Sequence, residues 1–206
     1  MAKISTYTTD TVISASDKLI GTDADSSNAT KNFLVSDISA YISSGIATNL
    51  AVTNVLNTTD TDNQVPSGLD TPLQVLFGIA QGTIADPVMV DVSGNITFNE
   101  AGIYLFNGYA NFERQGSSGG DAVIAFRALL NGVQAGVTKM VELKDVGTSV
   151  PYDLTLPINA TAGDVLTWEI MRDSSGVDQG GLYAHTLLGG WSNVPSVSVS
   201  IYKIGL

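Results

Sequence analysis

Residues 197–202 read Val-Ser-Val-Ser-Ile-Tyr, and this stretch decides the fold class. Its three aliphatic side chains fall on one face of an extended chain, while the two serines and the tyrosine fall on the other. The same period of two recurs at 102–112, at 154–158 and at 166–170. The pattern predicts an all-β domain built from antiparallel strands.

Turn signals separate these strands. Ser93-Gly94, Asn131-Gly132 and Ala162-Gly163-Asp164 each lie between two alternating runs. Asn-Gly between hydrophobic runs is the strongest short-range signal for a β-hairpin. Several short strands at this spacing predict a sandwich or a barrel.

Two of the expected strands, 102–112 and 122–130, are apolar on both faces. One face would pack in the domain core, and the second face would leave a large apolar patch in water. We therefore expect this face to be covered by other copies of the chain. The candidates for the core or for a trimer contact are Tyr104, Phe106, Phe112 and Trp168.

The composition excludes several classes of partner. The 206 residues carry a net charge of −11, with 9 basic residues scattered singly against 20 acidic ones. Nucleic acid and anionic membranes need clustered basic residues, so neither is expected as a partner. No apolar run approaches the roughly 18 residues of a membrane-spanning helix, and no signal-peptide core follows Met1. We expect synthesis in a cytoplasm and no membrane insertion.

The chain changes character near residue 65. Residues 1–64 are polar and predict an N-terminal arm and linker, whereas 65–206 predict one compact domain. A short helix is expected in the arm, with Ser36 as its N-cap and Gly45 as its end. Its apolar stripe must dock on something, because so short a helix is marginal alone. Residues 46–56 fit either helix or extended chain.

The sequence offers little material for catalysis or metal binding. It contains no cysteine and one histidine, His185. Residues 23–28 start like a calcium loop but lack the glycine and glutamate that an EF-hand requires. We therefore expect no enzyme, no cofactor and no metal site. The best place for recognition is the glycine-rich stretch 172–191, whose candidate ligand-binding residues are Tyr183, His185 and Trp191.

Residues 68–206 resemble the C1q/TNF-like jelly-roll superfamily. The matching stretches are 92–98 (Val-Ser-Gly-Asn-Ile-Thr-Phe), 101–106 (Ala-Gly-Ile-Tyr-Leu-Phe), 130–132 (Leu-Asn-Gly), 156–166 (ending Gly-Asp-Val-Leu) and 196–204. The resemblance implies a jelly-roll sandwich that assembles as a homotrimer. The chain departs from the family pattern by its long glycine-rich stretch before the last strand.

The arm resembles N-terminal segments of phage fibre and virion appendage proteins. Residues 19–23 (Leu-Ile-Gly-Thr-Asp) and 30–38 (Thr-Lys-Asn-Phe-Leu-Val-Ser-Asp-Ile) carry this resemblance, followed by Tyr41-Ile42. In such proteins the segment lies near the end that attaches to the virion. The resemblance therefore implies these virion-anchoring candidates: Phe33, Ile38, Tyr41 and Ile42.

Together, these features predict a structural protein of a phage virion, made in the host cytoplasm. It would be a short trimeric head fibre or decoration protein, anchored to a capsid or tail protein by its arm. The alternative is a tail-located protein whose knob recognises a glycan on the host surface. An enzyme or an adhesin of the same superfamily is a third hypothesis, which the missing signal peptide and catalytic set disfavour.

Overall fold

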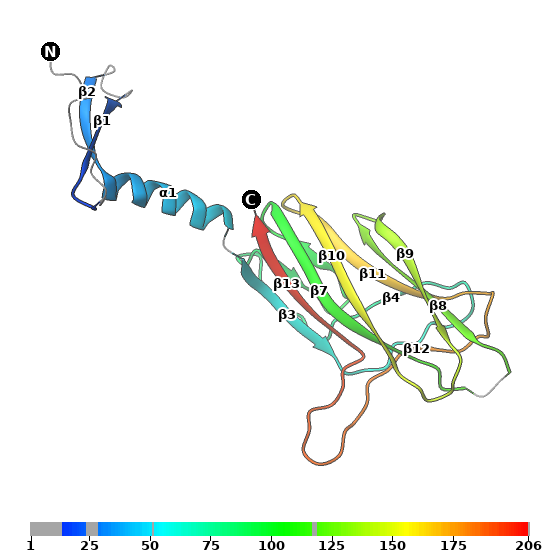
Figure 1. Cartoon of the computed structure of the whole chain (residues 1–206). Coiled ribbons are helices and arrows are strands. Elements are labelled where there is room, and N and C mark those ends of the chain that lie inside the picture. The colour runs from blue at the N-terminus through cyan, green and yellow to red at the C-terminus, as the bar shows by residue number, and fades with distance from the viewer. Residues whose placement is uncertain (1–13, 24–28, 51, 117–118, 206) are drawn as a thin grey trace. The chain divides into compact units, whose positions relative to one another are not determined.

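The computed structural model describes residues 14–23, 29–50, 52–116 and 119–205. The chain divides into two compact units, Met1–Ala51 and Val52–Leu206, which are treated separately below. The first unit is a small hairpin with a helix, and the second is a β-sandwich (Figure 1).

The first unit consists of two strands and one helix. Strand β1 (Lys18–Asp23) pairs antiparallel with β2 (Ala29–Leu34), and helix α1 (Val35–Leu50) follows directly. The sequence did not predict this hairpin. Part of the calcium-loop-like stretch, residues 24–28, lies outside the described residues.

Helix α1 is longer than expected. It was predicted to end at Gly45, but its backbone continues to Leu50. A glycine inside a helix costs only about 1 kcal/mol relative to alanine, so it does not end a helix by itself. The ambiguous stretch 46–56 proves to be both structures in turn, because the helix reaches residue 50 and a strand begins at residue 53.

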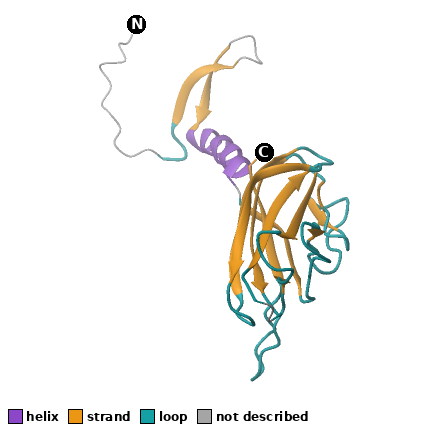
Figure 2. Cartoon of the chain, turned by 90° about the vertical axis from the view of Figure 1, so that its right-hand side faces the viewer, coloured by secondary structure: helices purple, strands orange, loops and turns teal. Residues whose placement is uncertain are grey.

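The second unit is all-β, as predicted. Its sheets form two layers (Figures 1 and 2). Sheet I has the order β10-β7-β13-β3 with β12 beside β7, and sheet II has the order β5-β6-β11-β8-β9 with β4 beside β11. The strands are β3 (Thr53–Asp60), β4 (Leu73–Gln74), β5 (Val88–Val90), β6 (Ile96–Phe98), β7 (Gly102–Glu113), β8 (Ala122–Leu130), β9 (Val133–Leu143), β10 (Val150–Ala160), β11 (Val165–Arg172), β12 (Gly181–Leu182) and β13 (Val197–Gly205).

The strand pairings are nested along the chain. Strand β8 pairs with β9, β7 pairs with β10, β6 pairs with β11, and β3 pairs with β13, all antiparallel. The innermost pair is joined by Asn131-Gly132, both in the left-handed region at φ 52° and 77°. In this nested order each strand pair encloses the next pair along the chain, as in one long hairpin that has been folded over into two layers.

The sandwich begins earlier than the sequence predicted. The expected boundary was residue 65, whereas the compact unit begins at Val52 because β3 pairs with β13. The sequence obscured β3 because two of its inward positions are polar. These side chains are satisfied locally: Thr58 donates to the carbonyl of Phe77, and Asp60 accepts the backbone N–H of Gly78 at 3.2 Å.

Aromatic side chains join the two sheets through the core. Phe106 of β7 lies 5.1 Å from Trp168 of β11, centroid to centroid, and Phe112 of β7 lies 5.3 Å from Phe126 of β8. The four predicted core or trimer candidates, Tyr104, Phe106, Phe112 and Trp168, are 0 to 6% exposed in the single chain. All four therefore contribute to the interior of one sandwich, and none is free to form an intersubunit surface.

Candidate interaction surfaces

Several large apolar side chains described in the first unit are exposed. Tyr41 is 81% exposed and Ile42 is 50% exposed, while Phe33 and Ile38 are half-buried. The hairpin adds apolar side chains that sequence reasoning did not select: Leu19 at 53%, Ile20 at 77% and Leu34 at 36% exposed. Two of them, Leu19 and Ile20, form an adjacent apolar pair near the start of β1, and this pair is the local signal that would have indicated them.

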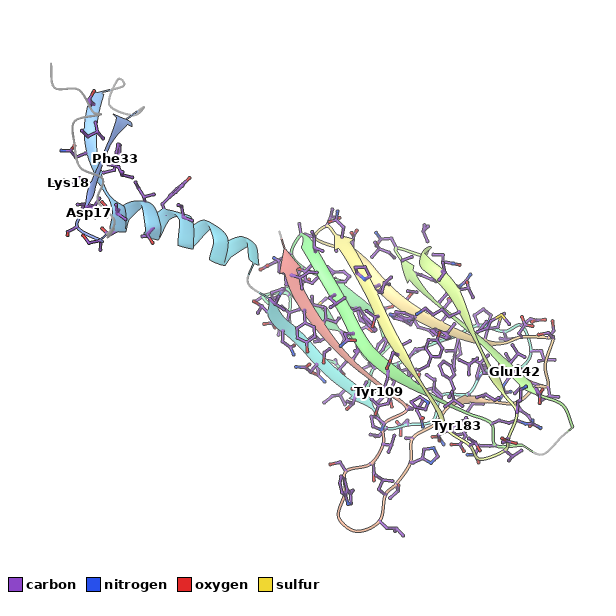
Figure 3. All side chains as sticks on the ribbon, in the orientation of Figure 1. Asp17, Lys18, Phe33, Tyr109, Glu142 and Tyr183 are labelled. Atoms are coloured by element: carbon purple, nitrogen blue, oxygen red, sulfur yellow. The ribbon has the colours of Figure 1, made fainter. Side chains whose placement is uncertain are left out.

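A short turn fixes where the helix starts relative to the hairpin. Asp17 accepts hydrogen bonds from the backbone N–H of Ser14 at 2.7 Å and from its hydroxyl at 3.0 Å, and these bonds lower the pKa of Asp17. The carbonyls of Asp17 and Ala15 in turn accept the N–H groups of Val35 and Ser36. Two of the helix's unpaired N-terminal donors are thereby satisfied. Figure 3 shows Asp17, Lys18 and Phe33 in this unit.

The outer face of sheet I is nearly free of charge. Among the exposed and half-exposed outward positions described on this sheet, Asp153 is the one that carries a charge. The others, by the alternation of each strand, are Asn57, Thr59, Ile103, Leu105, Asn107, Tyr109, Pro151, Thr155, Pro157, Asn159, Ser198, Ser200 and Tyr202. Partial burial raises the pKa of the Tyr109 hydroxyl. This face includes the outward side of residues 102–112, one of the two stretches whose apolar residues on both faces predicted self-association.

A loop of residues 183–195, here called the finger, separates β12 from β13, and both of these strands pair with β7. The chain leaves the edge of β7 after β12 and returns to it just before β13 (Figure 1). Asn111 of β7 holds both ends: its N–H donates to Ser196, its carbonyl accepts from Tyr183, and its side-chain amide donates to the Tyr183 carbonyl at 2.8 Å. Figure 3 labels Tyr183 at this root.

A buried carboxylate completes the finger root. The side chain of Glu113 is 1% exposed, and its Oε2 atom lies 2.6 Å from His185 Nε2. Ser149 donates to the same oxygen at 2.7 Å, and Gln115 donates to the other oxygen. His185 and Val194 also exchange two backbone hydrogen bonds, which close the base of the finger. Hydrogen bonds therefore hold the finger in place at its root.

This Ser-His-Glu cluster does not have the geometry of a catalytic triad. In a triad, one imidazole nitrogen holds the nucleophilic hydroxyl and the other is held by the carboxylate. Here Nε2 of His185 contacts both Ser149 Oγ, at 2.7 Å, and Glu113 Oε2. With the carboxylate on the same nitrogen as the hydroxyl, the imidazole cannot relay a proton between them.

The tip of the finger is its exposed part. Leu188 is 91% exposed, Trp191 is 77% exposed and Leu187 is 43% exposed, around two glycines with φ near +80°. The structure thus separates the three predicted ligand-binding residues. Tyr183 and His185 are half-buried in the root, and Trp191 lies in the exposed stretch beyond it. Sequence reasoning missed Leu188, which the uncharged run Leu-Leu-Gly-Gly-Trp would have indicated.

A small hollow lies on sheet II. Its volume is about 200 Å³, below the roughly 300–1,000 Å³ of sites for drug-sized ligands. Its polar side chains include Arg127 and Glu169, which pair with each other at 2.9 Å. The remaining lining residues are Pro72, Ala125, Phe126, Thr138, Ile170 and Met171. The two charged side chains already pair with each other, and most of the remaining lining is apolar. The hollow therefore offers no charged group that needs a ligand.

Neither a metal site nor a membrane-spanning helix is found among the described residues. Within them, no three His, Cys, Asp or Glu side chains gather as a potential metal site. Among the helices of the same residues, none is long and apolar enough to cross a membrane. No protein-family model matches the sequence, and no curated protein matches it.

Proposed function

We propose that the chain is a phage virion structural protein, a short trimeric head fibre or decoration protein that is made in the host cytoplasm. The first unit attaches to a capsid or tail protein, and the sandwich is the displayed knob. The observation that carries the proposal is the unequal burial of the two units. The sandwich buries its own core, whereas the hairpin and helix leave Ile20 and Tyr41 about four-fifths exposed.

The nested strand order supports a jelly roll for the knob. A jelly roll contains two Greek keys in two packed antiparallel sheets. The pairing of β3 with β13, β6 with β11, β7 with β10 and β8 with β9 supports this connectivity, because each outer pair encloses the next along the chain. The order also agrees with the family resemblance of residues 68–206, for which a C1q/TNF-like trimer is the expected assembly.

The outer face of sheet I supports self-association of the knob. Copies of a chain with net charge −11 repel one another unless they meet through surfaces that carry little charge. This face presents Leu105, Tyr109 and Tyr202 among amides and hydroxyls, with Asp153 near its edge on β10. We place the three-fold contact on this face.

A trimer also strengthens the proposed attachment. Each anchoring unit offers only a few exposed apolar side chains, so one unit alone would bind weakly. Three linked units bind with a gain in avidity of about 10²–10⁴ over a single one, provided that the geometry lets them engage together.

The first test is the solution mass of the intact protein by light scattering. We expect three times the 21.5 kDa chain mass. Leu105→Asp puts a carboxylate of each copy on the shared face and is expected to give a folded monomer. Val137→Asp, at a 72% exposed position of sheet II, is the matched control and should stay trimeric. A monomeric wild-type chain would refute the fibre proposal.

The second test is the presence of the protein in purified phage particles, by mass spectrometry. A particle-associated protein supports the virion role, and particles that lack it refute that role. Deleting residues 1–51 should abolish incorporation while the released sandwich keeps its trimeric mass.

A further inference from the structure

The finger tip carries Leu188, the most exposed of the large apolar side chains described, together with Trp191. They are 91% and 77% exposed, whereas the core residues of the same unit are at most 7% exposed. Soluble proteins rarely leave adjacent large apolar side chains in water without a partner. The tip therefore needs an occupant, and the root shows that the loop is held in place rather than loosely attached.

The charge of the chain limits the occupant. From Gln179 to Tyr202 no residue except His185 is ionisable below pH 9, although the chain as a whole carries −11. A negatively charged surface would be repelled by the acidic chain around the finger, and a basic surface would find no carboxylate at the tip. The tip suits a surface that is itself apolar and uncharged.

The outer face of sheet I carries little charge: of its described exposed and half-exposed outward positions, Asp153 is the charged one. The face presents Leu105 and Tyr109 among amides and hydroxyls, and the finger is continuous with it. The finger leaves and re-enters the edge of β7 at Asn111, two residues beyond Tyr109 in the outward-facing set. The finger extends from that end of the sheet (Figures 1 and 2). The sparsely charged sheet face and the finger thus form one surface of the chain.

We propose that the finger packs its tip, Leu188 and Trp191, on a neighbouring copy of this chain. The proposal rests on the proposed trimer and extends it, because the finger carries the contact past the end of sheet I. Burying these side chains adds apolar area at the rim of the assembly. The buried Glu113–His185 pair fixes the angle at which each finger leaves its own sandwich.

The absence of cysteine makes the proposal directly testable. Leu188→Cys and Val133→Cys each introduce a single thiol, at positions 91% and 72% exposed in one chain. If a neighbouring copy covers the tip, the thiol at position 188 of the intact trimer reacts with a disulfide reagent at least tenfold more slowly than the thiol at 133. Adding Leu105→Asp to make a monomer should restore the rate at position 188.

Fluorescence gives a second, independent readout. The chain has two tryptophans, and Trp168 is buried in the core. In Trp168→Phe, the remaining Trp191 should emit at a shorter wavelength in the trimer than in the Leu105→Asp background, and should resist quenching by acrylamide. Trp191→Phe, which reports Trp168 alone, is the control.

The outcomes separate this inference from the proposed function. A trimer in which position 188 reacts as fast as position 133 and Trp191 emits as in water overturns the inference and leaves the fibre proposal standing. A monomer overturns both. A blue shift of Trp191 that appears only after adding phosphatidylcholine vesicles or host cells also overturns the inference, and assigns the tip to lipid or to a host receptor.

Discussion

The two units differ in how far they bury side chains of the same kind. In the sandwich, Ile201 and Tyr104 are fully buried; in the hairpin–helix unit, Ile20 and Tyr41 are 77% and 81% exposed. A compact unit needs buried apolar area to offset the conformational entropy that folding removes. The sandwich has this area within one chain. The described part of the first unit does not, so we expect its order to depend on a partner.

The contrast gives each unit a part in the proposed fibre. A self-sufficient domain can be displayed in solvent, and a unit with an unfilled apolar surface can be docked. Changes that destroy the sandwich should therefore have the largest effect, and changes that affect only the small unit should have the smallest.

Truncation at the two candidate boundaries should give the largest difference. A chain that starts at Val65 lacks β3, which removes Leu56 from the core and leaves one edge of β13 unpaired. We expect it to aggregate or to unfold, because an unpaired central edge promotes association. A chain that starts at Val52 should melt cooperatively by circular dichroism. Equal melting of the two would contradict the assignment of β3 to the sandwich.

A charge in the core should be nearly as damaging. Phe106 is fully buried against Phe77 and Trp168, and truncating such a side chain to alanine alone costs about 3–5 kcal/mol. Phe106→Asp adds the cost of an unpaired buried charge, which exceeds what a domain with about 5–15 kcal/mol of stability tolerates. We expect no cooperative transition in thermal melts.

The neighbouring position is the matched control. Asn107 lies on the same strand but points to the outer face, so Asn107→Asp should keep a cooperative melt. Unfolding of both variants would contradict the assignment of the two faces of β7.

The sequence predicted the sandwich because its signals are local. The two faces of 102–112 follow from alternation, and the Asn-Gly turn fixes the β8–β9 hairpin. Strand β3 was missed because its inward Thr58 and Asp60 are residue types typical of solvent-facing positions. Their partners, Phe77 and Gly78, lie about 18 residues further along the chain. Long-range partners of polar groups are not encoded in a local pattern.

The candidate surfaces were predicted only in part, for the same reason. His185 was one of the ligand-binding candidates, and in the structure it contacts Glu113 and Ser149 at the end of sheet I. Their positions in the sequence give no hint of this contact. Trp191 was another ligand-binding candidate, and in the single chain it is 77% exposed. Its place in a polar, glycine-rich stretch is the local signal that pointed to it.

Substitutions in helix α1 should leave the sandwich unchanged and affect only attachment. Tyr41→Asp removes one of the most exposed apolar side chains described in the first unit. It should change the free energy of unfolding of the sandwich by no more than about 0.5 kcal/mol. Incorporation into particles should fall markedly, measured by quantitative mass spectrometry.

The control is Ala40→Asp, which adds the same charge at an exposed neighbouring position without removing a large apolar surface. A comparable loss of incorporation in both variants would indicate a general effect of charge. Normal incorporation of Tyr41→Asp would contradict its role in anchoring.

The smallest expected effect is a difference in acid sensitivity between two similar turns. Backbone and side-chain hydrogen bonds from Ser14 lower the pKa of Asp17, and bonds from Thr161 and Asn131 lower the pKa of Asp164. A lowered folded-state pKa stabilises the fold above the ordinary value of 3.8, and this stabilisation is lost as the pH falls through the folded-state pKa. Both turns should therefore weaken only below about pH 4.

The consequences should differ, because only one of these turns belongs to a unit with a core. Loss of the Asp17 turn frees the carbonyls that hold the start of α1, so helical signal should fall reversibly with acid, while the Asp164 turn is bridged by the β6–β11 pairing and should persist. Nuclear magnetic resonance amide shifts between pH 5 and pH 2 would follow both. Asp17→Asn should remove the pH dependence of the α1 amides, and if those amides keep titrating as before, the turn does not hold the helix start.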